Sequence, residues 1–285
     1  IISAKKLVFT MKRYKESEEY KKGLTARESL LISALARQDK RIFSIEDAWA
    51  LIIDGDAKKV MSSLIRKKWV LPLKRGLYGI VPLDMGMKGA DSFILHNFVI
   101  ASHLVEPYYI GYWSALNYHG HSDQIPRTIF IATTKPKMPL VILDSDYCFV
   151  TLQKRKFFGF QEIKIEGWKV NISSPEKTIA DCLDHPEQSG GIDEVAKAIY
   201  FNHKELDMGK IHEFAMMMGN MTILKRLGYI LEASGLLENY KDSFIRFGPS
   251  KGYPALDPLS PKKGKFNSKW GLLVNFEINP NRWMY

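Results

Sequence analysis

Residues 57–82 run AKKVMSSLIRKKWVLPLKRGLYGIVP, and this stretch predicts a helix followed by a β-hairpin. Apolar side chains recur at helical spacing between Asp56 and Trp69, and the opposite face is basic or hydroxyl-bearing, with no acidic residue. Residues 70–82 then form two short apolar runs around a Lys74-Arg75-Gly76 turn. The polar face of the predicted helix consists of Lys58, Lys59, Ser62, Ser63, Arg66 and Lys67.

Two more helices are predicted before this stretch. The first begins after Thr25, and the second begins at Ser44, where Asp47 three residues later completes a capping-box pattern. Three helices and a basic-tipped hairpin predict a winged helix-turn-helix domain over residues 25–83, preceded by a charged arm or helix over 1–24. We expect the following side chains of the first two helices to face its core: Leu30, Leu31, Ala34, Leu35, Ile45, Ala48, Trp49 and Ile52.

The net charge of +10 is concentrated at the N-terminal end of the chain. Residues 1–90 contain 19 basic and 10 acidic residues, a balance of +9, whereas residues 91–285 contain 22 and 21, a balance of +1. A concentrated positive field favours a polyanionic partner, because each phosphate contact releases condensed counterions. The alternatives are a basic but merely solvated surface, double-stranded RNA, and a protein partner.

The predicted helix and hairpin indicate where double-stranded DNA would bind. Lysine, arginine and serine side chains can reach phosphates and base edges from a helix in the major groove, while the turn of the hairpin reaches the backbone or the minor groove. The expected DNA contacts are Lys58, Lys59, Ser62, Ser63, Arg66, Lys67, Lys74 and Arg75.

A glycine- and methionine-rich linker over 84–90 leads to a larger domain over 91–285, so the predicted fold class is α+β for the whole chain. Ser174-Pro175 predicts a capped helix start, and residues 249–285 form an irregular tail with a strand near 270–278. Helices are expected over 92–104, 111–119, 175–183, 192–202, 208–218 and 222–234, and strands over 127–133, 146–153 and within 160–172.

Composition excludes several classes of protein. No stretch approaches the ~20 apolar residues of a membrane span, and the first residues lack the layout of a secretory signal, so we expect a cytoplasmic protein with no membrane partner. The chain has only two cysteines, Cys148 and Cys182, and we expect both to be buried core residues rather than a disulfide or a catalytic thiol.

Several strings, taken in their order along the chain, resemble the AbiEi family. They are Arg75-Gly-Leu-Tyr78 with Pro82, the segment 112–120 (YWSALNYHG), the segment 174–182 (SPEKTIADC), Gly190-Gly-Ile192 with Val195, and Arg226-Leu-Gly-Tyr229. The resemblance covers residues 25–240, and the tail after Tyr240 fits the family pattern less well.

The resemblance implies an antitoxin of an abortive-infection toxin–antitoxin operon. Its winged helix would repress its own promoter, and its C-terminal domain would counteract a nucleotidyltransferase toxin without forming a stable complex with it. The family's DNA contacts would fall on the predicted third helix and the hairpin, which the charge distribution also indicates.

Two patterns offer an enzymatic alternative. Asp146 followed by Glu162-Ile-Lys164 has the order of the carboxylates and lysine in metal-dependent nucleases, and His119-Gly-His121 with Asp123 could supply metal ligands. Such triplets are frequent by chance in a chain with 25% charged residues, and His119 has a simpler role at the end of a helix. We therefore expect a DNA-binding regulator with no catalytic residue, cofactor or metal, with a nuclease directed by the winged helix as the alternative.

Overall fold

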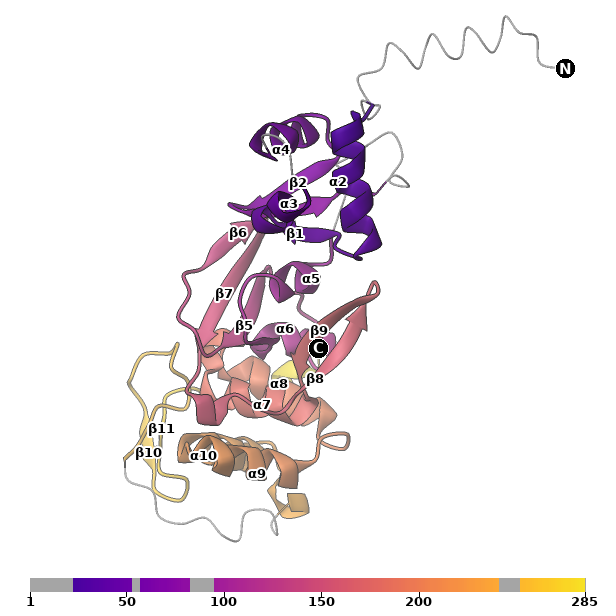
Figure 1. The fold of residues 1–285 in the computed structure, drawn as a ribbon. Helices are drawn as coiled ribbons and strands as arrows, with labels where there is room; N and C mark the ends of the chain where they lie inside the picture. The colour runs from indigo at the N-terminus through magenta and orange to yellow at the C-terminus, as the bar shows by residue number, and fades with distance from the viewer. Residues whose placement is uncertain (1–22, 53–56, 83–94, 241–251, 285) are drawn as a thin grey trace, which may run out of the picture. The chain divides into compact units, whose positions relative to one another are not determined.

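The computed structural model describes residues 23–52, 57–82, 95–240 and 252–284 (Figure 1). The chain divides into two compact units, Ile1–Leu95 and His96–Tyr285. The predicted linker over 84–90 and nearly all of the predicted arm over 1–24 lie outside the described residues. No helix among those described combines the length and apolar character that a membrane crossing requires.

Within residues 23–52 and 57–82, the N-terminal unit contains three helices and a three-stranded antiparallel sheet with strand order β1-β3-β2. The predicted hairpin is confirmed, since β2 and β3 pair on either side of a turn at Arg75 and Gly76. β1, which pairs with β3, was not predicted from the sequence. The elements in chain order are α2 (Ala26–Arg37), β1 (Ile42–Ser44), α3 (Ile45–Leu51), α4 (Ala57–Arg66), β2 (Val70–Lys74) and β3 (Leu77–Ile80).

The first two helices begin at capping boxes. The capping box predicted at Ser44 and Asp47 is confirmed, and Thr25 forms a second one with Glu28. Two of the expected core residues, Leu30 and Trp49, are exposed instead. On α2 the buried face is formed by positions 28, 31 and 35, so Glu28 occupies an inward position and Leu30 points away from it.

Helix α4 ends three residues earlier than the sequence predicts. Lys68 adopts a φ of 60°, and the backbone N–H of Trp69 donates to the carbonyl of Leu64 at 3.0 Å, which is the hydrogen bond that closes a Schellman turn. The left-handed residue turns the chain out of the helix, so the buried Trp69 packs in the core as the residue before β2.

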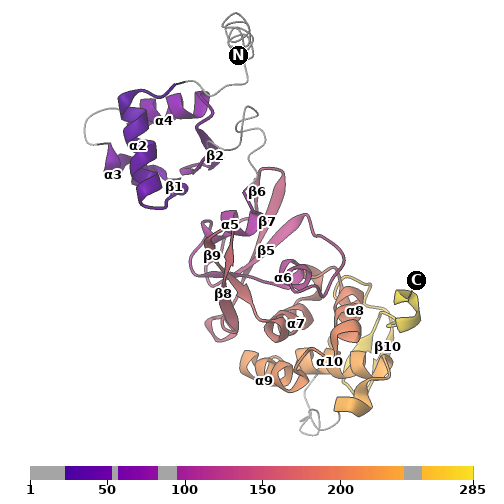
Figure 2. The same ribbon diagram turned by 90° about the vertical axis from the view of Figure 1, so that its right-hand side faces the viewer.

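The second unit is built on a six-stranded mixed sheet, order β6-β7-β5-β4-β9-β8 (Figures 1 and 2). The pairs β4·β9 and β5·β7 are parallel and the others antiparallel. The short strands β4 and β6 were not predicted. The strands are β4 (Tyr108–Ile110), β5 (Thr128–Thr133), β6 (Leu140–Ile142), β7 (Ser145–Thr151), β8 (Phe160–Ile165) and β9 (Trp168–Ser173).

Helices of the second unit form its largest core together with the tail. The predicted start of α7 at Ser174-Pro175 is confirmed, because the Ser174 hydroxyl accepts from the N–H of Lys177. Described in this unit are the helices α5 (Asn97–Ser102), α6 (Tyr112–Tyr118), α7 (Pro175–Asp184), α8 (Ile192–Asn202), α9 (Met208–Met218) and α10 (Met221–Ala233). For the expected helix over 92–104, residues 92–94 lie outside the described part of the chain.

The tail is more ordered than expected. It forms a hairpin of β10 (Lys265–Asn267) and β11 (Leu272–Val274), and Trp270 lies between the two strands rather than starting the predicted one. Leu256, Trp270 and Leu272 are buried in the same core as α7, α8 and α10. Cys182 is buried as expected, but Cys148 is only half-buried, on β7.

Candidate functional site

Helix α4 presents the predicted polar face. Ala57, Met61 and Leu64 are buried on one side of the helix. The other side carries Lys58, Lys59, Ser62 and Arg66, all of which are exposed. This segregation follows from the helical period, because residues three and four apart share a face. Four of the eight predicted contacts therefore lie on one accessible helix surface.

Lys67 and Ser63 have a different environment. The ammonium group of Lys67 donates to the carboxylate of Glu28 at 2.6 Å and to the carbonyl of Gly23 at 2.9 Å. Burial raises the pKa of Glu28, but the hydrogen bonds from Lys67, Thr25 and Ser63 outweigh it and lower the pKa to about 2. These two predicted contacts thus hold α4 against α2, and a phosphate would have to compete with a buried carboxylate for Lys67.

The turn of the β2–β3 hairpin is fixed to the start of α3. Gly76 has a φ of 81°, which suits glycine, and its carbonyl accepts from the N–H of Ile45 at 3.0 Å. Arg75 is exposed at this turn, and Lys74 is half-buried beside it. The turn is therefore anchored, while its arginine faces solvent.

The segment from α4 to the hairpin turn carries charge of a single sign. Residues 57–77 contain seven lysines and arginines and no aspartate or glutamate. A surface of this kind attracts polyanions at long range and gains free energy from each phosphate it neutralises. Neither α2 nor α3 has such a composition, since Glu28, Glu46 and Asp47 lie in their first turns.

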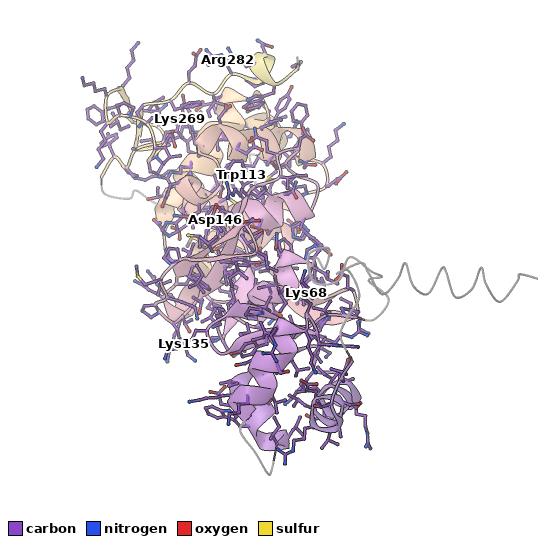
Figure 3. The ribbon with its side chains drawn as sticks, turned by 90° about the horizontal axis from the view of Figure 1, so that it is seen from above. Lys68, Trp113, Lys135, Asp146, Lys269 and Arg282 are labelled. Atoms are coloured by element: carbon purple, nitrogen blue, oxygen red, sulfur yellow. The ribbon has the colours of Figure 1, made fainter. Side chains whose placement is uncertain are left out.

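The three residues of the nuclease-like pattern do not meet. Asp146 lies on β7, where it pairs with Arg127 at 3.6 Å, and it is labelled in Figure 3. Glu162 lies on β8 with Lys164, and it pairs with Lys169 at 2.9 Å. Strands β7 and β8 are four positions apart in the sheet, or roughly 19 Å at the usual strand spacing. One metal ion cannot bind both carboxylates at that separation.

The histidine pattern is also not assembled into a metal site. His119 caps the end of α6 and its Nε2 lies 2.8 Å from the carbonyl of Ser173, whereas Asp123 is exposed and pairs with Lys197 at 3.4 Å. Burial lowers the pKa of His121, and the nearby His119 lowers it further. Within the described parts of the chain, no group of three His, Cys, Asp or Glu side chains could hold a metal ion.

A buried charge pair joins α7 to the sheet. Lys177 and Asp181 are one helical turn apart, form an ion pair, and are fully buried. The hydroxyl of Tyr109 on β4 donates to Asp181 at 2.8 Å and accepts from Lys177 at 3.1 Å. The ammonium group also lies 5.1 Å from the ring centre of Phe158. Each charge in this group is compensated, as burial requires.

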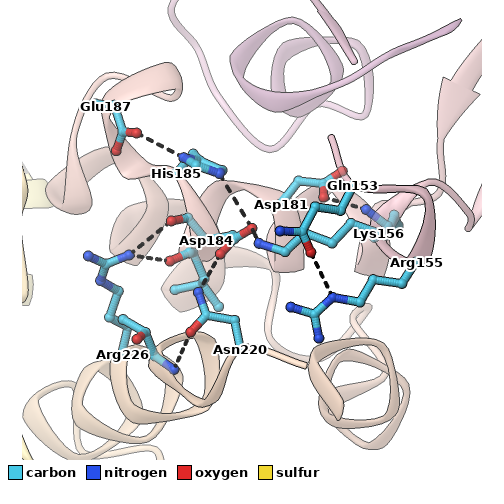
Figure 4. Close-up of polar contacts among 12 residues, drawn as sticks. Gln153, Arg155, Lys156, Asp181, Asp184, His185, Glu187, Asn220 and Arg226 are labelled. Carbon is cyan, nitrogen blue, oxygen red and sulfur yellow. Dashed lines mark hydrogen bonds and ion pairs between the residues drawn. The ribbon is translucent and has the colours of Figure 1, made fainter. Parts of the chain in front are cut away.

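A second cluster follows at the end of α7 (Figure 4). The carboxylate of Asp184 accepts from Lys156 at 2.5 Å and from the side-chain amide of Asn220 at 2.6 Å. A hydrogen bond to Glu187, followed by the charge of Asp184, raises the pKa of His185. The guanidinium of Arg226 donates to the carbonyl of Leu183 at 2.6 Å. This cluster ties the end of α7 to α10 and to the segment before β8.

Tyr112 lies beside both clusters in an unusual backbone conformation. It has a φ of 54° where β4 turns into α6, and its fully buried hydroxyl has no hydrogen-bond partner among the described residues. Burial raises the pKa of Tyr112 well above its ordinary value, and the Asp181 and Asp184 carboxylates add to this. The hydroxyl is therefore neutral.

Sequence reasoning did not identify these clusters, although it used the strings that contain them. Tyr112 opens the segment 112–120 and Lys177 and Asp181 lie in the segment 174–182, both of which carry the family resemblance. The available signal was a lysine and an aspartate at i and i+4, on a helix where Thr178, Ile179, Ala180, Cys182 and Leu183 are also buried. Lys177 and Asp181 are wholly buried and paired with each other, so neither side chain reaches the protein surface.

Comparisons with known proteins show the fold but no family. No protein-family model matches the chain, and no curated protein matches its sequence. The crystal structure of the RV2827C protein from Mycobacterium tuberculosis is similar, with a TM-score of 0.64 and 13% sequence identity. The match covers 90% of this chain and 94% of that one, so it extends over parts of both units.

Proposed function

We propose that the N-terminal unit is a winged helix-turn-helix module that binds double-stranded DNA, and that the chain is a transcription regulator. The order helix, strand, helix, helix, strand, strand supports this proposal, because it leaves α4 and a basic hairpin on one continuous segment. The observation that carries it is the uniform charge of residues 57–77, seven basic residues with no acid.

The proposed contacts divide between groove and backbone. Lys59, Ser62 and Arg66 project from the exposed side of α4 into the major groove, with Lys58 at its edge. Arg75 reaches the minor groove or a phosphate from the hairpin turn, with Lys74 beside it. Ser63 and Lys67 act indirectly, because their hydrogen bonds to Glu28 fix α4 on α2.

The biological role we propose is that of an antitoxin of the AbiEi type. In this proposal the N-terminal unit represses the promoter of its own operon, and the second unit opposes a nucleotidyltransferase toxin without forming a stable complex with it. The support is the resemblance over residues 25–240, which rests on the strings quoted above in their order along the chain. No catalytic step, cofactor or metal enters the proposal.

Binding of the full chain to DNA tests the first part. The probes are a short duplex from the DNA immediately upstream of the chain's own gene and a shuffled duplex of the same composition. If Arg66 reads a base, Arg66→Ala is expected to weaken binding to the upstream duplex by ~1–3 kcal/mol. If Arg75 contacts a phosphate, Arg75→Ala is expected to weaken binding to both duplexes about equally.

The matched control is Arg37→Ala, which removes an exposed arginine from the last turn of α2 in the same unit. It is expected to leave both affinities unchanged. The groove assignment is wrong if Arg66→Ala and Arg75→Ala have no more effect than this control.

A nuclease remains the alternative function, and it has a direct test. The full chain is incubated with single- and double-stranded DNA and RNA in the presence of Mg²⁺ or Mn²⁺. We expect no cleavage, because Asp146 and Glu162 lie on strands four positions apart. Cleavage that disappears in Glu162→Ala would overturn the regulator proposal in favour of the enzyme.

A further inference from the structure

The tail carries an exposed aromatic pair. Phe266 on β10 is 72% exposed and Tyr253 is 48% exposed, and their ring centres lie 5.1 Å apart with the rings nearly perpendicular. Large aromatic side chains are usually buried, and an exposed pair of them is typical of a binding surface. The hairpin that bears Phe266 lies beside α10 (Figures 1 and 2).

The segment that carries this pair is rich in lysine. Residues 252–269 contain four lysines and one acidic residue, Asp257, which is buried and accepts from the hydroxyl of Ser260 at 2.6 Å. Lys269, labelled in Figure 3, pairs with Glu232. Lys262, Lys263 and Lys265 are exposed and have no ion pair within the described ranges. The exposed charges of residues 252–269 are therefore positive, whereas the net charge of residues 91–285 is only +1.

The backbone beneath these side chains is fixed. The side-chain amide of Asn275 donates to the carbonyls of Asp257, Ser260 and Pro261 at 2.8, 3.2 and 3.2 Å, which holds the loop that precedes the lysines. A Cβ at Gly264 would overlap the carbonyl of Val274, so the chain passes there only because residue 264 is glycine. The exposed groups are thus presented by an ordered loop and hairpin.

A second set of contacts anchors the hairpin to α10. The ammonium group of Lys225 donates to the carbonyls of Gly252 and Gly271 at 2.8 and 3.0 Å. The ring of Trp270 packs directly on Gly228, and its indole N–H donates to Glu232. Since both the loop over 257–261 and the β10–β11 hairpin are held by these contacts, their backbone loses little conformational entropy when a ligand binds.

We propose that Tyr253, Phe266, Lys262 and Lys263 form a binding site for single-stranded nucleic acid. Unpaired bases stack on exposed aromatic rings, and lysines beside the rings hold the phosphates, which is the chemistry of sequence-tolerant single-strand binding. A duplex, whose bases are already stacked, offers no free base face to the rings. The site is separate from the face of α4 and does not depend on the proposed DNA binding there.

The test uses the full chain and labelled oligouridine, with oligothymidine and a duplex of equal length as the other arms. Oligouridine containing 4-thiouridine is expected to crosslink, on irradiation, to peptides within 252–269. Because a duplex is also proposed to bind the full chain through α4, occupancy of this site is judged by competition for the crosslink within 252–269. We expect unlabelled single strands to compete and the duplex not to. Oligouridine and oligothymidine differ only by the 2′-hydroxyl and the thymine methyl. The ratio of their affinities therefore shows whether the site prefers RNA or DNA.

Variants separate stacking from charge. Phe266→Leu is expected to weaken single-strand binding by roughly fivefold or more, as the loss of one stacked base predicts, whereas Phe266→Trp retains it. Lys262→Ala with Lys263→Ala is expected to lower the salt dependence as well as the affinity. Phe201→Leu is the control, because Phe201 is 51% exposed and also lies edge-on to a tyrosine.

Some outcomes would overturn the proposal. These are crosslinks confined to other segments, equal losses in Phe266→Leu and Phe201→Leu, or failure of Phe266→Trp to retain binding. Absence of single-strand binding by the full chain would overturn the proposal as well. None of these results bears on duplex binding through Arg66 and Arg75, so the two proposals fail independently.

Discussion

The ammonium group of Lys67 lies 2.6 Å from the carboxylate of Glu28, which joins the residue after α4 to the buried face of α2. Only 3% of the Glu28 side chain and 14% of the Lys67 side chain are exposed. A pair this well shielded is little screened by salt, in contrast to ordinary surface pairs. The pair therefore contributes to the packing of α4 against α2 rather than to the positive charge that α4 presents to solvent.

This pair predicts an acid-sensitive contribution to stability. The pKa of Glu28 is lowered from 4.5 to about 2, so its contribution is complete above about pH 4.5 and is lost as the pH falls towards 2. The size of the shift corresponds to ~3 kcal/mol. Urea unfolding of the full chain and of Glu28→Gln should differ by about this amount near pH 6, and the difference should shrink as the pH is lowered below 4.5.

The control for this prediction is Asp47→Asn. Asp47 also forms a capping box and an ion pair, with Lys40 at 2.5 Å, but the side chains of this pair are 27% and 44% exposed. We expect a smaller loss of stability from that variant. A pH-independent difference between the wild type and Glu28→Gln would contradict the assignment of the Glu28 pKa.

The sequence allowed local features of the fold to be predicted, because helix period, caps and turn residues act within a few positions. The helices α8 and α9, the hairpin around Gly76 and the caps at Ser44 and Ser174 all follow from such signals. The missed strands β1, β4 and β6 are three residues long, which is too short to show a period, and β1 and β4 are also defined by partners distant in the chain. β1, for example, pairs with residues 77–79.

For the candidate site, the sequence predicted where the basic residues lie but not which of them are exposed and which are paired within the fold. Arg66 and Lys67 are adjacent and both positively charged, yet Arg66 is exposed on α4 and Lys67 is paired with Glu28. Only the packing of α2 against α4 distinguishes them. The separation of Asp146 from Glu162 likewise depends on strand order, which adjacency in the sequence does not reveal.

A second prediction concerns the buried pair on α7. Lys177→Met should destabilise the second unit by ~3–5 kcal/mol, because it leaves the Asp181 carboxylate buried without its ion-pair partner. Lys177→Met combined with Asp181→Leu should recover part of this loss, because no charge is then buried unpaired, although the Tyr109 hydroxyl loses both of its partners. Thermal unfolding of Lys177→Met, Asp181→Leu and the double variant measures the coupling. A double variant as unstable as the sum of the single variants would show that the pair does not act as a unit.

A third prediction concerns the contact between α10 and the tail. A Cβ at Gly228 would overlap the ring of Trp270, so Gly228→Ala should destabilise the docked tail by ~1–3 kcal/mol through overpacking. Limited proteolysis should then cleave the tail faster than in the wild type. Adding Trp270→Leu removes the ring and should make Gly228→Ala nearly neutral in that background. If Gly228→Ala is tolerated alone, the packing of Trp270 on α10 is not as close as described.

The last prediction separates the basic residues of the N-terminal unit by the salt dependence of duplex binding. The logarithm of affinity falls linearly with the logarithm of salt concentration, and each lost phosphate contact reduces the slope by roughly 0.9. Arg75→Ala should therefore reduce the slope by about that amount if Arg75 contacts a phosphate. Lys67→Met should leave the slope unchanged while lowering stability, because Lys67 is occupied by Glu28. Arg37→Ala should change neither quantity. A Lys67→Met variant that remains stable but shows the smaller slope would place Lys67 among the phosphate contacts and reverse its assignment to the fold.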